Sequence, residues 1–112
     1  MVDIVSTGTF EKNVKKIAKK DKLLYKDLQD LLDLLTLKPN SGTYLGSNAY
    51  KIRIKNSSSN KGKSGGYRII SYFWNEHTLG LLTIYSKSDR ENIFENEIEN
   101  LIKELAQSIN DG

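Results

Sequence analysis

The sequence predicts an α+β fold in which an N-terminal helix hairpin and a C-terminal helix pack on a mostly antiparallel, four-stranded twisted sheet. Three observations support this prediction. Apolar residues recur at helical spacing in the first third of the 112 residues, alternate as in strands through the middle, and return to helical spacing near the end. No linker or internal repeat interrupts the pattern, so we expect residues 1–112 to form a single domain.

The N-terminal part predicts one strand and two helices. Residues 2–5 form a short apolar run that suits a strand, and residues 10–18 have a helical apolar face with Thr9 as a plausible N-cap. A second helix follows, with one stripe formed by Leu24, Leu28, Leu31 and Leu35. The breakers in "KPNSG" end it, so the two helices should form a hairpin that needs a sheet to cover its apolar face.

The rest of the chain predicts three strands and a final helix. "AYKIRIKN" alternates strictly, which is a strong strand signal, and the polar stretch "NSSSNKGKSGG" separates it from "YRIISYFW". The short turn "NEHTLG" then leads into "LLTIYS", as expected for a hairpin. The final helix should carry an apolar face made by Phe94, Ile98, Leu101, Ile102, Leu105 and Ile109.

Composition narrows the possible functions. The chain has no cysteine and one histidine, which argues against a disulfide, a zinc site or a histidine-based catalytic triad, and we expect neither a metal nor a cofactor. We see no secretory signal and no apolar run long enough to cross a membrane. A cytoplasmic protein without membrane contact is therefore expected.

The stretch "GKS" at residues 62–64 resembles the end of a phosphate-binding P-loop. That motif requires a glycine at position 57, where this chain has Ser57, and it requires a helix after the loop. The segment that follows here has the pattern of a strand. An ATP-binding loop is therefore a poor interpretation.

Basic residues concentrate in the middle of the chain. Seven lysines and arginines and no acidic residue lie between Leu34 and Asn75, whereas the segment after Asn75 has three basic and eight acidic residues. Lys51 and Arg53 share one strand face, and Arg68 lies on the next strand. Lys87 follows the last strand, so four cations could converge on one patch. We expect this patch to bind an external anion, most simply a phosphodiester.

Such a patch could support RNA cleavage without histidine. Attack by the RNA's own 2′-OH needs a base, cations that stabilise the charged phosphorane, and an acid for the leaving 5′ oxygen. Arginine suits the stabilising role, and a lysine crowded by other cations could act as base or acid. The reaction becomes plausible when another macromolecule orients the RNA for in-line attack.

The segments "YKIRIK", "GKSGGYRIISYFW" and "LLTIYSKSDRENIF", after a helix hairpin, resemble the RelE/ParE superfamily of type II toxins, most closely its HigB/RelE branch. The resemblance implies a toxin that is a ribosome-dependent endoribonuclease and cuts mRNA in the A site. It also implies a cognate antitoxin, typically a helix-turn-helix protein, and operator DNA binding only through the complex with that antitoxin.

By this resemblance, Arg68, Lys87, Lys51 and Arg53 take the catalytic positions. Lys55, Lys61, Lys63 and Arg90 become candidate contacts to mRNA or rRNA, with Arg90 the weaker one. Phe94 stands where RelE has a catalytic tyrosine, so either a lysine takes over that role or the cleavage is weak. Tyr85 and Tyr67 are other possible substitutes. Two alternative functions fit the same fold: a ParE-type inhibitor of DNA gyrase, and a non-catalytic RNA-binding module.

Overall fold

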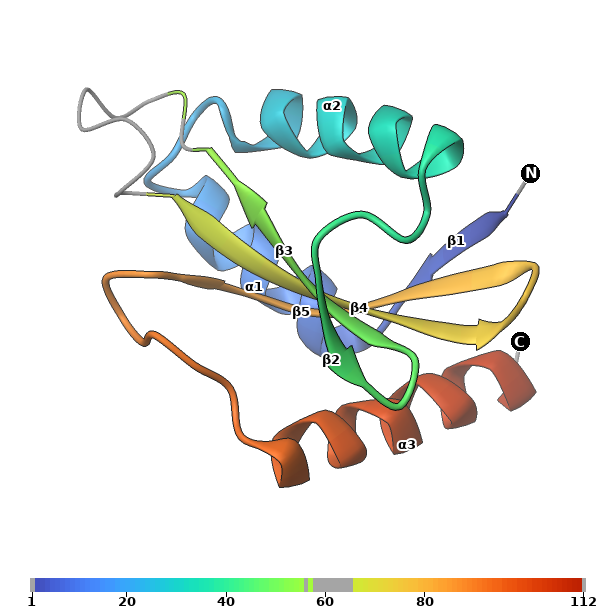
Figure 1. Cartoon of the computed structure of the whole chain (residues 1–112). Helices are drawn as coiled ribbons and strands as arrows, with labels where there is room; N and C mark the ends of the chain where they lie inside the picture. Colours follow the sequence, from blue (N-terminus) through green and yellow to red (C-terminus); the bar gives the residue numbers. More distant parts are fainter. Residues whose placement is uncertain (1, 56, 58–65, 112) are drawn as a thin grey trace.

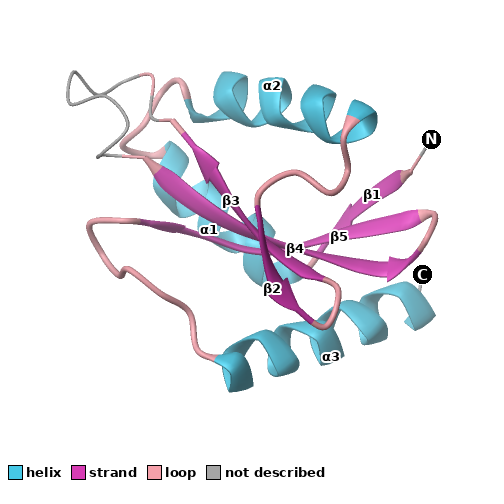
Figure 2. Cartoon of the chain, viewed as in Figure 1, coloured by secondary structure: helices cyan, strands magenta, loops and turns pink. Residues whose placement is uncertain are grey.

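The computed structural model describes residues 2–55, 57 and 66–111. It has an α+β fold with three helices and a mixed sheet of five strands (Figures 1 and 2). The strands are β1 (Asp3–Ser6), β2 (Thr43–Gly46), β3 (Ala49–Ile54), β4 (Tyr67–Asn75) and β5 (Thr78–Ser86), and the helices are α1 (Gly8–Ala18), α2 (Leu24–Leu37) and α3 (Glu95–Asp111). The predicted α+β class is confirmed.

The sheet has the strand order β1-β5-β4-β3-β2, so the prediction of four strands was wrong by one. The additional strand is β2, which forms a hairpin with β3. Its sequence, "TYLG", directly follows the helix-breaking segment and ends in a turn where Gly46, Ser47 and Asn48 all have positive φ. A four-residue strand between breakers and a turn lacks the alternation that marks longer strands, so periodicity alone did not detect it.

All neighbouring strands except one pair are antiparallel, as predicted. The exception is β1, which runs parallel to β5 at one edge of the sheet. Within the antiparallel part, Arg53 of β3 lies directly opposite Arg68 of β4, and Arg68 lies opposite Tyr85 of β5. These three side chains therefore occupy neighbouring positions across the sheet.

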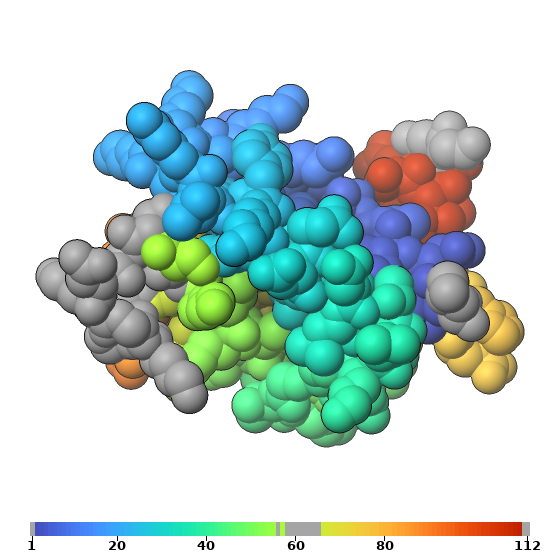
Figure 3. Space-filling model, turned by 90° about the horizontal axis from the view of Figure 1, so that it is seen from above, coloured from blue at the N-terminus to red at the C-terminus, as the bar shows by residue number. Residues whose placement is uncertain are grey.

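One face of the sheet is covered by the helix hairpin of α1 and α2, whose blue and cyan atoms occupy much of the face seen in Figure 3. The predicted leucine stripe of α2 is buried against Ile52, Ile54 and Ile69. Helix α1 begins two residues earlier than a Thr9 cap would require, because the side chain of Thr7 accepts a hydrogen bond from the backbone N–H of Phe10. Thr7 is therefore the N-cap, and the prediction of Thr9 was wrong.

The opposite face is covered by α3 (Figure 1). The predicted apolar residues of this helix pack on Ile70 and Leu82, with the exception of Phe94, which precedes the helix and is 68% exposed. The carboxylate of Glu104 accepts hydrogen bonds from the backbone N–H and the hydroxyl of Thr9 at 2.8 Å each. The middle of α3 is thereby joined to the start of α1.

Two buried carboxylates support the ends of β3 and β4. Asp27 of α2 accepts hydrogen bonds from the backbone N–H of Ser57 at 3.0 Å and from its hydroxyl at 2.6 Å. Asp21 accepts one at 2.7 Å from the hydroxyl of Tyr67, the first residue of β4. Burial and this bond raise the pKa of the Tyr67 phenol. Among the described residues, no helix is both long and apolar enough to cross a bilayer.

Candidate functional site

Four basic side chains line one cavity of about 300 Å³, as the strand pattern predicted. Lys51 and Arg53 come from β3, Arg68 comes from β4, and Lys87 comes from the connection after β5. In β3 the alternation sends the isoleucines into the core under the helix hairpin and the two basic residues to the opposite face. The sheet register then places the β4 arginine beside them.

Arg68 is the most enclosed cation of this cavity, with 6% of its surface exposed. Its Nη1 donates a hydrogen bond of 3.2 Å to the carbonyl of Tyr67. Within the described part of the chain, no carboxylate lies within 4.0 Å of the Arg68 guanidinium. Arg53 faces it directly across the strand pair, and like charges in that position are destabilising. An anion in the cavity would offset both the cost of burying the Arg68 charge and its repulsion from Arg53.

Three further residues complete the lining of the cavity. Thr43 comes from β2, and Glu91 and Asn92 come from the β5–α3 connection. None of these three residues was predicted to lie in the site, because β2 was not predicted and because Glu91 lies far along the chain from the basic strand. For Glu91 and Asn92, the signal was the polar run "SDREN" (residues 88–92), since Lys87 immediately before it was already placed near the patch.

The other predicted contacts lie outside this cavity. Lys55 is exposed just beyond the end of β3 and does not line it. Lys61 and Lys63 lie outside the described residues. Arg90 is near in sequence to Glu91, but its guanidinium points to other partners.

Arg90 is the centre of a contact group that holds the start of α3. Its Nη1 and Nη2 donate to the two carboxylate oxygens of Glu97 at 2.9 and 2.6 Å, and its Nε donates to the carbonyl of Asn92 at 3.0 Å. The guanidinium carbon also lies 5.5 Å from the centre of the Tyr85 ring and 6.0 Å from that of Phe94. The hydrogen bonds from Arg90 lower the pKa of the Glu97 carboxyl.

The two tyrosines considered as substitutes for Phe94 differ in position. Tyr67 points to the face covered by the helix hairpin, where its hydroxyl is bonded to Asp21. Tyr85 lies on the same face as Arg68 and is its cross-strand neighbour, but its hydroxyl is fully buried and has no hydrogen-bond partner among the described residues. Burial raises the pKa of the Tyr85 phenol. Neither hydroxyl lines the cationic cavity.

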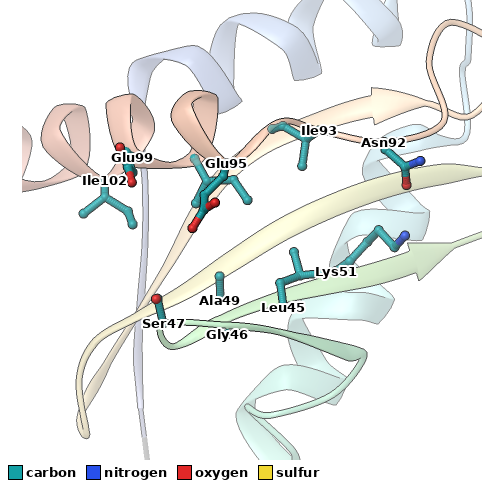
Figure 4. Close-up of a pocket in the computed structure, with 11 residues that line it drawn as sticks. Leu45, Gly46, Ser47, Ala49, Lys51, Asn92, Ile93, Glu95, Glu99 and Ile102 are labelled. Atoms are coloured by element: carbon teal, nitrogen blue, oxygen red, sulfur yellow. The ribbon is translucent and has the colours of Figure 1, made fainter.

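A second hollow adjoins the cationic cavity between the β2–β3 hairpin and α3 (Figure 4). Lys51 and Asn92 line both spaces, so the two lie next to each other. Apolar side chains line the second hollow from both sides, among them Ala49 of β3 and Ile102 of α3, and Glu95 and Glu99 stand on its α3 side. Across the described residues, no group of three or more His, Asp or Glu side chains is placed to hold a metal ion.

A mixed sheet with a helix hairpin on one face, one helix on the other and a cation-lined cavity defines an α+β protein with a site suited to an anion. The model of the family described as "RelE toxin of RelE / RelB toxin-antitoxin system" matches residues 3–111. The chain therefore belongs to the RelE toxin family, whose members act as toxins paired with antitoxins. A search of curated proteins finds no match.

Proposed function

We propose that this chain is a toxin that enters the A site of the ribosome, cleaves the mRNA codon there and so inhibits translation. The observation that carries the proposal is the cavity lined by four basic side chains, of which Arg68 is buried and has no ion-pair partner among the described residues. Family membership supports it, because toxins of the RelE family are endoribonucleases as a class. The ribosome would supply the in-line orientation of the RNA that the cavity alone does not impose.

In the proposed reaction the scissile phosphate occupies the cavity and no metal takes part. Arg68 and Arg53 stabilise the charge that develops on the phosphoryl oxygens. Lys51 and Lys87 line the same cavity as this pair of arginines, and each can hold the phosphate or transfer a proton. Lys55, Lys61 and Lys63 would contact mRNA or rRNA outside the cavity. Arg90, by contrast, is assigned to holding the β5–α3 connection, because Glu97 already occupies its guanidinium.

We further propose that the antitoxin, a helix-turn-helix protein, suppresses the activity in the cytoplasm by covering the cationic cavity. Carboxylates of the partner would then take the place of the RNA phosphates. Binding of operator DNA would come from the antitoxin and not from this chain.

Brief induction followed by primer-extension mapping of mRNA ends tests the function. New ends within translated codons are expected for the wild type, and Arg68→Ala should remove them. Lys87→Ala should weaken them, whereas Lys103→Ala, a change to an exposed lysine on α3, should leave them intact. Growth arrest without mRNA cleavage contradicts the proposal. If a DNA-damage response accompanies that arrest, the gyrase-inhibitor alternative replaces it, and salt-sensitive RNA binding without toxicity points to a binding module.

A further inference from the structure

Glu91 is the only carboxylate that lines the cationic cavity within the described part of the chain. It is exposed, so a ligand in the cavity can reach it. All four cations of the cavity are described, and none of them lies within 4.0 Å of the Glu91 carboxylate. A carboxylate whose role was to neutralise the cluster would be expected to form such an ion pair. Glu91 therefore lines the cavity without forming an ion pair with any of its four cations.

The backbone that carries Glu91 is held on both sides. Arg90 precedes it and donates from Nε to the carbonyl of Asn92, which follows it, so a hydrogen bond spans the residue. The remaining guanidinium nitrogens of Arg90 are bound to Glu97. The arginine next to Glu91 in the sequence is therefore paired with Glu97 and not with Glu91. Glu91 is thus presented from a braced turn rather than from a free chain.

We propose that Glu91 is the general base of the cleavage reaction, an assignment that rests on the proposed endoribonuclease function. A glutamate carboxylate is ionised at neutral pH and accepts a proton, whereas a lysine ammonium is protonated and donates one. A cavity with one carboxylate and two lysines therefore holds a base and an acid in their resting forms. With Glu91 as base, no lysine has to lose a proton before the reaction begins.

In the proposed step, the 2′ oxygen of the RNA loses a proton to Glu91 and the 5′ oxygen gains one from a lysine. The 2′-OH proton of the RNA moves to the Glu91 carboxylate while the 2′ oxygen forms its bond to phosphorus. The bond between phosphorus and the 5′ oxygen breaks, and that oxygen takes a proton from the ammonium of Lys87 or Lys51. The products are a 2′,3′-cyclic phosphate and a 5′-hydroxyl, with Glu91 protonated and one lysine neutral until solvent restores both.

The phenols near the site are less suited to this role. Phe94 has no hydroxyl, and the hydroxyl of Tyr85 is buried away from the cavity. Tyr67 lies on the other face of the sheet, bonded to Asp21. Glu91 can thus supply the base that Phe94 cannot, and no element of the fold has to move.

The test uses the full-length chain with programmed ribosomes in single-turnover cleavage, and compares Glu91→Gln with Asp89→Asn. Asp89 is an exposed neighbour that does not line the cavity, so its variant controls for the loss of one negative charge. We expect Glu91→Gln to slow cleavage by about 10²- to 10⁴-fold, the usual contribution of a general base. The acidic limb of the pH–rate profile should disappear in the same variant. Added formate should partly restore Glu91→Ala.

The opposite role predicts opposite results. If Glu91 only offsets the positive charge of the cavity, Glu91→Gln will bind the ribosome–mRNA complex more tightly and cleave at an unchanged rate. Cleavage by Glu91→Gln within about twofold of the wild type, with its pH profile intact, overturns this assignment alone. Absence of cleavage by the wild type instead overturns the proposed function, and the assignment falls with it.

Discussion

Replacing Arg68 by methionine should make the protein more stable while abolishing its activity. The side chain is 6% exposed, faces Arg53 across the strand pair and has no carboxylate within 4.0 Å among the described residues. Methionine has a flexible, unbranched side chain that can follow the path of the arginine stem without carrying its charge. In the proposed function the reaction needs this charge, whereas the packing of the sheet does not.

The expected gain in the free energy of unfolding is about 1–3 kcal/mol. Removing the like charge opposite Arg53 contributes roughly 0.2–1 kcal/mol. Replacing buried charged groups by apolar ones of similar volume stabilises other proteins by about 1–4 kcal/mol at best. The lost hydrogen bond to the Tyr67 carbonyl subtracts about 1 kcal/mol. For a chain of 112 residues, this gain raises Tm by about 4–13 °C.

Urea and thermal unfolding of the isolated protein measure this change. The matched control is Arg53→Met, which relieves the same repulsion at an exposed position and should gain less than about 1 kcal/mol. Added sulfate should stabilise the wild type more than Arg68→Met, because only the wild type keeps the full anion site. A loss of more than about 1 kcal/mol in Arg68→Met refutes the reasoning, since it means that the guanidinium is satisfied in the folded state.

Two further predictions concern α3. Arg90 holds the pKa of the Glu97 carboxyl below its ordinary value, so this pair stabilises the fold above the unfolded-state pKa of glutamate, and the contribution is lost as pH falls through the lower folded-state pKa. Urea unfolding between pH 7 and pH 3 should show a smaller loss of stability in Glu97→Gln than in the wild type, and equal slopes contradict this. Gly80→Ala should destabilise the protein by about 1–3 kcal/mol, because the new Cβ would collide with the fully buried Leu105. In thermal melts, the double variant Gly80→Ala, Leu105→Ala should lose less stability than the sum of the losses of the two single variants.

Most of the fold could be predicted because long periodic segments report which side of an element is buried. The leucine stripe of α2, the alternation in β3 and the apolar face of α3 all correspond to buried surfaces. The hairpin strand β2 could not be predicted in this way, because four residues are too few to show a period. Thr7 and Thr9 are both chemically able to cap α1, and only the hydrogen bond from Phe10 distinguishes them.

The candidate site was predictable where one strand carried its own pattern. Lys51, Arg53 and Arg68 follow from the alternation and pairing of two adjacent strands, and both are local properties. The partners of Arg90 and the position of Glu91 depend instead on the path of the β5–α3 connection. Arg90, predicted to contact RNA, thus binds Glu97 and Asn92 of the same chain, and Glu91, which was not predicted as a site residue, lines the cavity.

The parallel pairing of β1 with β5 has a consequence for the order of events during folding. The first strand of the chain has its partner near the far end, and Thr7 also bonds the backbone of Leu81 and Leu82 there. Contacts between such distant segments raise the contact order, which slows folding because a long loop must close before any bond rewards it. The ribosome must therefore finish β5 before the sheet can be completed. We expect the cell that makes the toxin to have an interval, set by the topology of the sheet, in which the new chain is still harmless.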